Sequence, residues 1–166
     1  MESASTSSVL TIRGMRNSDA ANLWCVVDLS FSKFMGFFAK LSIEEKGQTL
    51  VAEVSDTIIG FAKLTKFSIG GRKFGCILWI AVHPKFRRKG VASALTDKGI
   101  IWLKKDCANA VFASTQRSNK NALRVLNHRG FRVTGFLDLW SQFGWRVFQL
   151  YREIWLAPGE VVLMHV

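Results

Sequence analysis

Apolar and polar positions alternate, or recur with a helical period, along most of the chain. Alternating or continuous apolar runs bounded by turn residues predict strands over residues 9–15, 49–54, 58–67, 73–82, 110–115, 131–139 and 147–155. Helical spacing predicts helices over residues 19–31, part of 32–46, a stretch that begins near 91, and 118–130. Ser55 to Thr57, and the pair Gly70 and Gly71, separate consecutive strands and predict hairpin turns.

The order of these elements indicates an α/β fold with a mixed sheet and helices on its faces. The central strand–helix–strand–helix section needs parallel strand pairing, whereas the flanking segments fit hairpins. A length of 166 residues without a linker-like stretch predicts one domain over residues 9–166. We expect residues 1–8 to form a flexible polar tail. The last segment, 155–166, leaves two alternatives open: an extra strand or the contact of a homodimer.

Composition and charge narrow the class of protein. Apolar residues make up 49% of the chain and charged residues 21%, which is typical of a globular domain. No apolar run approaches the roughly 18 residues of a membrane helix, and the polar N-terminal segment does not predict a secretory signal. We therefore expect a cytoplasmic protein without a membrane partner. The net charge of +11 predicts a positive field that attracts nucleic acid, an acidic membrane face or a phosphorylated small molecule.

The cysteines and histidines do not indicate a metal site or a disulfide. The cysteines are odd in number and far apart, so we expect small buried side chains in a reducing compartment. The histidines show no ligand spacing, so no metal is expected. The residues concerned are Cys25, Cys76, Cys107, His83, His128 and His165.

The segment HPKFRRKGVASAL, residues 83–95, joins an apolar strand to a helix and carries the strongest chemical signal. A helix N-terminus has unpaired N–H groups and partial positive charge, and Gly90 allows backbone to approach a ligand closely. The amides of Arg88 to Ala92 therefore fit a phosphate. Charge around them comes from Lys85, Arg87, Arg88 and Lys89. A solvated basic turn is the alternative, and the glycine motifs of nucleoside triphosphatases and dinucleotide folds are absent.

Two motifs resemble those of the GNAT superfamily of N-acetyltransferases. RRKGVA, residues 87–92, matches the family pattern (Gln/Arg)-x-x-Gly-x-(Gly/Ala). Downstream, Asn119-x-x-Ala122 followed by an apolar pair and Gly130-Phe131 is similar to the family's second segment. The resemblance implies a central, mostly antiparallel twisted sheet with one splayed parallel strand pair and helices on both faces.

The resemblance also implies the reaction: acetyl-CoA is the cosubstrate, and a primary amine attacks its thioester directly in a ternary complex. The amides of Arg88 to Ala92 would hold the pyrophosphate of coenzyme A, and the strand main chain would pair with the pantetheine arm. Asn119 would face the same arm, cap its helix, or do both. The implied cosubstrate-binding residues are Ile80, Ala81, Val82, Arg87, Arg88, Lys89, Gly90, Val91, Ala92 and Asn119.

The catalytic acid and base are not assigned by the resemblance. The family often places a tyrosine acid where this chain has Leu126, and the strand 73–82 contains no carboxylate. His128 is a candidate for the acid and Glu53 is a candidate for the base. Two other carboxylates, Asp138 and Glu153, are further candidates for the base.

The acceptor is expected to be an amine of a small molecule or a protein. In this family's fold, the aromatic segments 31–38 and 139–148 would line its groove, unless they are simply core. Their aromatic character favours an apolar acceptor, and the scarcity of acids argues against a polycation. Two other functions remain open: a non-catalytic acetyl-CoA-binding domain, and a basic module that binds nucleic acid.

Overall fold

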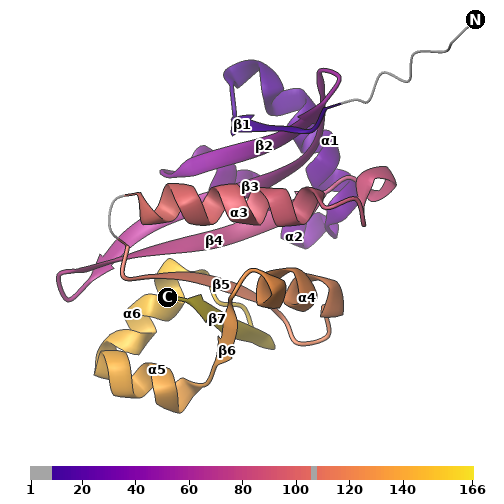
Figure 1. Ribbon diagram of the computed structural model, residues 1–166. Coiled ribbons are helices and arrows are strands. Elements are labelled where there is room, and N and C mark those ends of the chain that lie inside the picture. Colours follow the sequence, from indigo (N-terminus) through magenta and orange to yellow (C-terminus); the bar gives the residue numbers. More distant parts are fainter. Residues whose placement is uncertain (1–8, 106–107) are drawn as a thin grey trace, which may run out of the picture.

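A mixed sheet of seven strands organises the computed structural model, which describes residues 9–105 and 108–166 (Figure 1). Its strands are β1 (Thr11–Gly14), β2 (Gln48–Val54), β3 (Thr57–Ile69), β4 (Arg72–Val82), β5 (Ala110–Gln116), β6 (Arg132–Thr134) and β7 (Glu160–His165). They lie in the order β1-β2-β3-β4-β5-β7-β6. Only β4 and β5 run parallel; every other neighbouring pair is antiparallel. The predicted mostly antiparallel mixed sheet is confirmed.

Two short turns build the antiparallel part of the sheet. Ser55 and Asp56 both have positive φ, 47° and 61°, and connect β2 to β3. Gly70 and Gly71, with φ of 58° and 79°, connect β3 to β4. Two successive left-handed residues match the right-handed twist of the flanking strands, so both predicted hairpins form.

The helices cover both faces of the sheet. They are α1 (Ala20–Ser30), α2 (Lys33–Glu44), α3 (Val91–Lys104), α4 (Lys120–His128), α5 (Phe136–Phe143) and α6 (Val147–Glu153). Side chains alternate across a strand: Ala62 packs in a core with Leu95 of α3, and its neighbour Phe61 packs with Leu23 of α1. Similarly, Phe112 packs with Leu150 of α6. Helices α3 and α4 therefore lie on one face, and the other four lie on the opposite face (Figure 1).

The strand expected over 131–139 is confirmed only near its start, and the strand expected over 147–155 is wrong. Only Arg132–Thr134 is a strand there, and most of the region folds as α5 and α6. In α5, Phe136, Leu139, Trp140 and Phe143 recur at helical spacing, and this period outweighs the high strand propensity of aromatic residues. The last strand is instead β7, so the extra strand expected as one alternative for 155–166 is confirmed, whereas the contact of a homodimer stays a prediction.

The expectation that the cysteine side chains are buried is only partly confirmed. Cys76 is buried in β4, but Cys25 is exposed, because the buried stripe of α1 passes through Leu23, Val26 and Val27. Cys107 and the expected tail 1–8 lie outside the described residues. None of the helices in the described ranges is long and apolar enough to cross a membrane.

Candidate functional site

A gap opens between β4 and β5 because their parallel pairing stops early. The paired residues run from Phe74 with Ala110 to Ile77 with Ala113, although β4 continues to Val82. Leu78 is an extra residue in β4, since Ile77 pairs with Leu64 of β3 and Trp79 pairs with Lys63. Such a bulge bends a strand and increases its twist. Beyond Ile77, no strand among the described residues pairs with the β5-facing edge of β4. Apart from the Val82 carbonyl, which accepts from the side chains of Arg87 and Ser30, the main-chain groups of this edge are left for another partner.

The loop that leaves β4 ends at an uncapped helix N-terminus. Gly90 precedes α3 in a left-handed conformation with φ of 79°, and its carbonyl accepts the Ala94 N–H at 3.0 Å. The amides of Val91 to Ser93 therefore have no partner within the helix. Arg88 is also left-handed, with φ of 61°. A side chain built on Gly90 would meet nothing within 4 Å, so this face of the loop is open.

The basic side chains of the loop are exposed, and one of them is fixed. Arg87 donates from Nε to the Val82 carbonyl at 3.0 Å, which ties the loop to the end of β4. Lys89 lies over the Phe86 ring, 5.2 Å from its centre. His83 accepts the Lys85 N–H through Nδ1 at 3.2 Å, so its imidazole stabilises the turn that follows β4.

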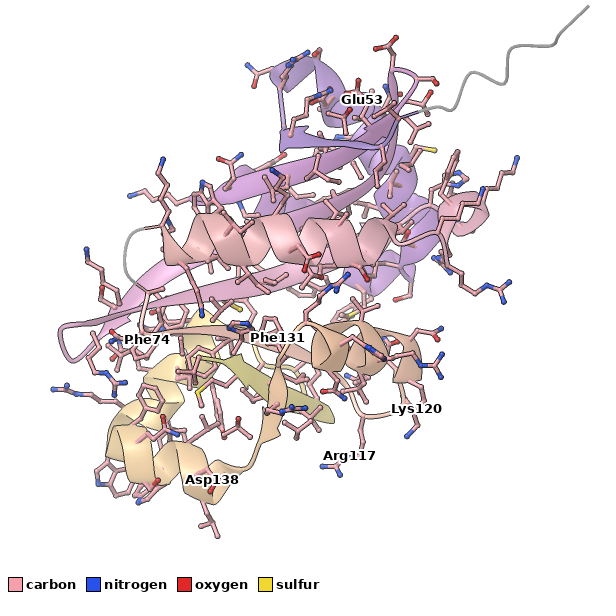
Figure 2. The ribbon with its side chains drawn as sticks, viewed as in Figure 1. Glu53, Phe74, Arg117, Lys120, Phe131 and Asp138 are labelled. Atoms are coloured by element: carbon pink, nitrogen blue, oxygen red, sulfur yellow. The ribbon has the colours of Figure 1, made fainter. Side chains whose placement is uncertain are left out.

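The second motif lies across the gap, at the start of α4. Asn119 caps α4: its Oδ1 accepts the Ala122 N–H at 3.1 Å, and its side chain is exposed. Figure 2 shows Arg117 and Lys120 beside this helix start. Helices α3 and α4 begin at the same end of the sheet (Figure 1), and the ion pair between Arg129 and Asp97, at 3.0 Å, links them. The two motifs thus lie at the same end of the sheet (Figure 1).

The catalytic candidates taken from the sequence do not gather at the gap. Glu53 lies on β2, separated from β4 by β3, and accepts from Arg13 Nε at 2.6 Å. Arg13 also contacts Asp19 at 2.7 Å, and this pairing lowers the pKa of Asp19 to about 2. Glu153 is paired with Arg152 at 3.0 Å.

The other two catalytic candidates, Asp138 and His128, lie on helix surfaces. Asp138 is exposed on α5, at the far side of the molecule from Glu53 (Figure 2). His128 is exposed on the last turn of α4. Leu126, which stands where the family often has its tyrosine acid, is only 5% exposed and belongs to the core between α3 and the sheet.

The aromatic segments are partly core and partly surface. Phe31 packs edge-on against Trp79, the residue after the bulge, with ring centres 5.3 Å apart. Phe34 and Phe37 of α2 are 71% and 64% exposed. In 139–148, Leu139 and Val147 are buried, but Trp145 is 77% exposed. Both segments lie on the face opposite α3 and α4.

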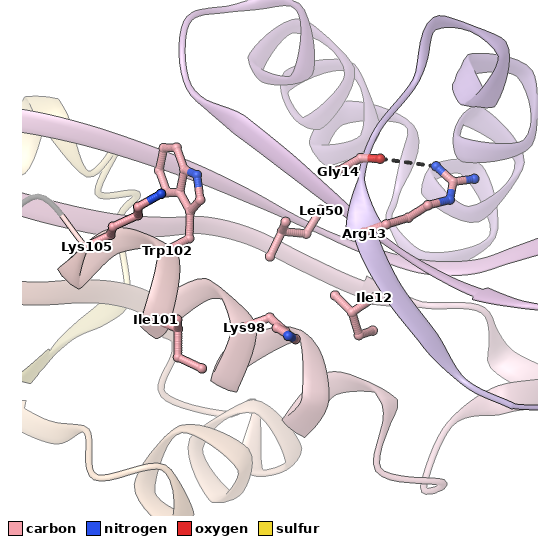
Figure 3. A pocket seen from close by; sticks show the side chains of 8 residues that line it. All are labelled: Ile12, Arg13, Gly14, Leu50, Lys98, Ile101, Trp102 and Lys105. Atoms are coloured by element: carbon pink, nitrogen blue, oxygen red, sulfur yellow. Dashed lines mark hydrogen bonds between the residues drawn. The ribbon is translucent and has the colours of Figure 1, made fainter.

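Two hollows of the described surface lie elsewhere. A groove of about 440 Å³ separates β1 and β2 from the second half of α3, and Figure 3 shows its apolar floor with lysines at the rim. Its lining residues are Ile12, Arg13, Gly14, Leu50, Lys98, Ile101, Trp102 and Lys105. A second hollow, of about 480 Å³, lies between residues 15–24 and 43–49. Neither hollow is lined by a residue of the 83–92 loop.

The structure adds Ser114 and Glu160 to the residues beside the gap. Sequence reasoning missed both, because Glu160 reaches β5 only through the pairing of β7 with β5. An isolated carboxylate before the apolar run VVLM is the only sequence signal. Among the described residues there is no group of three or more side chains suited to a metal ion.

Comparison with known proteins shows the family of the chain. A family model described as the acetyltransferase (GNAT) family matches residues 19–131, more than half of the chain. None of the curated proteins compared with the chain matches it significantly.

Several solved structures share the fold. A putative GNAT-family acetyltransferase from Desulfovibrio desulfuricans is 18% identical, with a TM-score of 0.71 over 94% of this chain and 98% of that one. PaiA N-acetyltransferase from Thermoplasma acidophilum, in complex with coenzyme A, is 16% identical, with a TM-score of 0.69 over 95% and 98%. A GNAT-family acetyltransferase from Brucella melitensis, in complex with acetyl-CoA, is 20% identical, with a TM-score of 0.62 over 75% and 84%.

Proposed function

Because the chain belongs to the GNAT acetyltransferase family, we propose that it is an acetyl-CoA-dependent N-acetyltransferase acting on a primary amine. The observation that carries the proposal is the strand gap with an open, uncapped helix start at its end. An unpaired strand edge suits an extended amide-containing chain, and a helix N-terminus suits a phosphate. Coenzyme A has both parts in one molecule.

The proposed binding residues follow from this arrangement. The amides of Arg88 to Ala92 would bind the pyrophosphate, and the main chain of Ile80 to Val82 would pair with the pantetheine arm. Residues 83–96 contain no carboxylate, so the segment itself contributes no negative charge that would oppose an anion. Arg87 would also position the loop, because its hydrogen bond to the Val82 carbonyl keeps the loop beside the strand edge.

The acceptor is proposed to be an apolar or aromatic primary amine. The face opposite α3 presents exposed aromatic residues on α2 and on the 139–148 segment. Acidic side chains are few in both segments, so a polycationic acceptor would find little charge to pair with.

A second candidate is an acetyl-CoA-binding domain without catalysis. Its support is Leu126, which is buried and cannot donate the proton that the family's tyrosine supplies. The pKa of a thiol, near 8.5 by analogy with cysteine, allows a thiolate to leave without much help, so we rank the enzyme first.

Calorimetric titration at physiological salt tests the binding part of the proposal. We expect acetyl-CoA and desulfo-CoA to bind with similar affinity, because neither the loop nor the strand edge needs the sulfur atom. ATP should bind much more weakly, since it lacks the pantetheine arm. Equal affinity for ATP, or no saturable binding of acetyl-CoA, would contradict the proposed site.

Thiol release from acetyl-CoA distinguishes the enzyme from the non-catalytic domain. We suggest 2-phenylethylamine and phenylalanylglycine as acceptors, which cover a small aromatic amine and a peptide N-terminus. Release with either amine supports the enzyme. Salt-dependent binding of RNA without binding of acetyl-CoA would instead support the nucleic-acid-binding alternative.

A further inference from the structure

Ser114 and Glu160 form a hydrogen-bonded pair at the point where β4 and β5 part. Ser114 is the first residue of β5 beyond the last rung of the parallel pairing, which joins Ile77 to Ala113. Glu160 begins β7, on the other side of β5, where it pairs with Gln116. Ser114 Oγ donates to Glu160 Oε2 at 2.7 Å. Both residues are half-buried, so a carboxylate lies beside the opening of the gap.

This carboxylate lies on the face of the sheet opposite α3. Alternate residues of a strand share a face, and Phe112 and Val162 belong to the core formed with α5 and α6. Ser114 and Glu160 are two residues away from them, on the same face. Cys76 of β4 also faces this side; burial raises the pKa of its thiol, and the charge of Glu160 adds to the rise. The field of Glu160 therefore reaches β4 across β5.

One oxygen of the carboxylate is anchored and the other is free. The Ala157 N–H also donates to Oε2, at 3.1 Å. Among the described residues, no donor binds Oε1 and no cation pairs with the carboxylate. The turn before β7 adds rigidity, since the Glu160 N–H donates to the Ala157 carbonyl at 3.2 Å. Glu160 thus presents a single unoccupied acceptor atom in a fixed direction.

The other carboxylates of the described chain lack this combination of features. Five are paired with arginine or lysine: Asp19, Asp28, Glu53, Asp97 and Glu153. Four are exposed on turns or helix surfaces: Glu44, Glu45, Asp56 and Asp138.

We propose that Glu160 is the general base of the reaction and that Ser114 is its positioning residue. This inference rests on the proposed N-acetyltransferase function. The nitrogen of a neutral primary amine attacks the thioester carbonyl carbon, and the C–N bond forms. Glu160 takes one proton from the nitrogen as that atom becomes positively charged. The C–S bond breaks, coenzyme A leaves as a thiolate, and the proton passes from Glu160 through solvent to that thiolate.

The test compares Glu160→Gln with the wild type in two assays. The glutamine carbonyl can still accept from Ser114 and Ala157, so the turn should keep its structure, which a thermal melt checks. We expect kcat/KM for thiol release with 2-phenylethylamine or phenylalanylglycine to fall about 100-fold, within the range of general base catalysis. Calorimetric affinity for acetyl-CoA should stay within about twofold, because the carboxylate lies outside the proposed loop and strand-edge contacts.

Chemical rescue separates a base from a merely structural carboxylate. Glu160→Ala should be inactive and should regain part of its activity in added formate, which supplies a carboxylate to the space left behind. Ser114→Ala keeps the carboxylate of Glu160 but removes one of its hydrogen bonds. We therefore expect a smaller loss of kcat/KM for thiol release, of about tenfold or less. Asp56→Asn is the matched control: it removes one exposed carboxylate on the β2–β3 turn and should leave both assays unchanged.

Three outcomes would overturn the inference. The first is a Glu160→Gln rate within about threefold of the wild type, well below the usual contribution of a base. The second is a parallel loss of rate and acetyl-CoA affinity without rescue by formate. The third is no thiol release by the wild type with either amine although acetyl-CoA binds. Failure of the wild type to bind acetyl-CoA at all would instead refute the proposed function.

Discussion

Gly90 allows the proposed phosphate loop to be tested with two nearly isosteric side chains. We predict that Gly90→Asp binds acetyl-CoA more weakly than Gly90→Asn. Both substitutions place a side chain where φ is 79°, and neither meets an atom within 4 Å at Cβ. Any strain of the left-handed backbone, about 1–2 kcal/mol for most residues and less for asparagine and aspartate, is therefore largely shared. The difference between the two variants is one negative charge.

The magnitude follows from Coulomb's law. An aspartate about 5 Å from a bound phosphate charge would repel it by about 3 kcal/mol at an effective dielectric constant of 20. The loop is exposed, so solvent and salt reduce this value, and we expect about 2 kcal/mol. That energy corresponds to an affinity for acetyl-CoA roughly 30-fold lower in Gly90→Asp than in Gly90→Asn.

Calorimetric titration of both variants at low and at physiological salt measures this ratio. Gly71 supplies the control, because it also has φ of 79° and open space at Cβ, but it lies at the opposite end of β4. Gly71→Asp and Gly71→Asn should bind acetyl-CoA equally well. The reasoning is refuted if the two Gly90 variants bind acetyl-CoA equally well. It is also refuted if the ratio of their affinities for acetyl-CoA does not shrink as salt is added.

Three further predictions concern single side chains near the motifs and the first strand. Asn119→Ala should lose about 1 kcal/mol of unfolding free energy with its helix cap, whereas Asn119→Asp should keep the cap but lose the amide donor. Weaker acetyl-CoA binding by Asn119→Asp would support a contact with the cosubstrate, and unchanged binding by both variants would leave only a capping role. Leu126→Tyr should lower the unfolding free energy by about 1–3 kcal/mol, by overpacking the core, without faster thiol release; faster release at unchanged stability would contradict the burial argument. Asp19→Asn should cost about 2 kcal/mol in urea unfolding at pH 7, because Arg13 lowers the Asp19 pKa from 3.8 to about 2. This contribution to the unfolding free energy is present above pH 3.8 and is lost as the pH falls through about 2. The wild type should therefore show this loss and the Asp19→Asn variant should not. The same dependence of unfolding free energy on pH in both proteins would refute the prediction.

Local patterns in the sequence predicted the part of the fold that depends on neighbouring residues. The β2–β3 and β3–β4 hairpins follow from their turn residues, and the start of α3 follows from Gly90. The same reasoning located the two motifs, because each lies on one continuous stretch of chain.

The errors lie where tertiary packing decides the outcome. Residues 136–153 are rich in aromatic side chains with high strand propensity, but α5 and α6 form because a helix buries Leu139, Val147 and Leu150 together against the sheet. Glu160 could not be found from its neighbours, since its place beside Ser114 depends on pairing between segments 46 residues apart. Glu53 failed as a candidate base for the same reason: its partner Arg13 lies 40 residues away.

The position of β7 has a consequence for the order in which the fold is assembled. β7 follows β6 in the chain but lies between β5 and β6, and it pairs with both. During synthesis, β5 therefore has an open edge until the last of these seven strands emerges, and neither neighbour of β7 can complete its pairing before then. Apolar residues along that edge are exposed to pairing with other chains in the meantime. The strand that closes the sheet also carries Glu160, so the proposed base reaches its place only when the fold is finished.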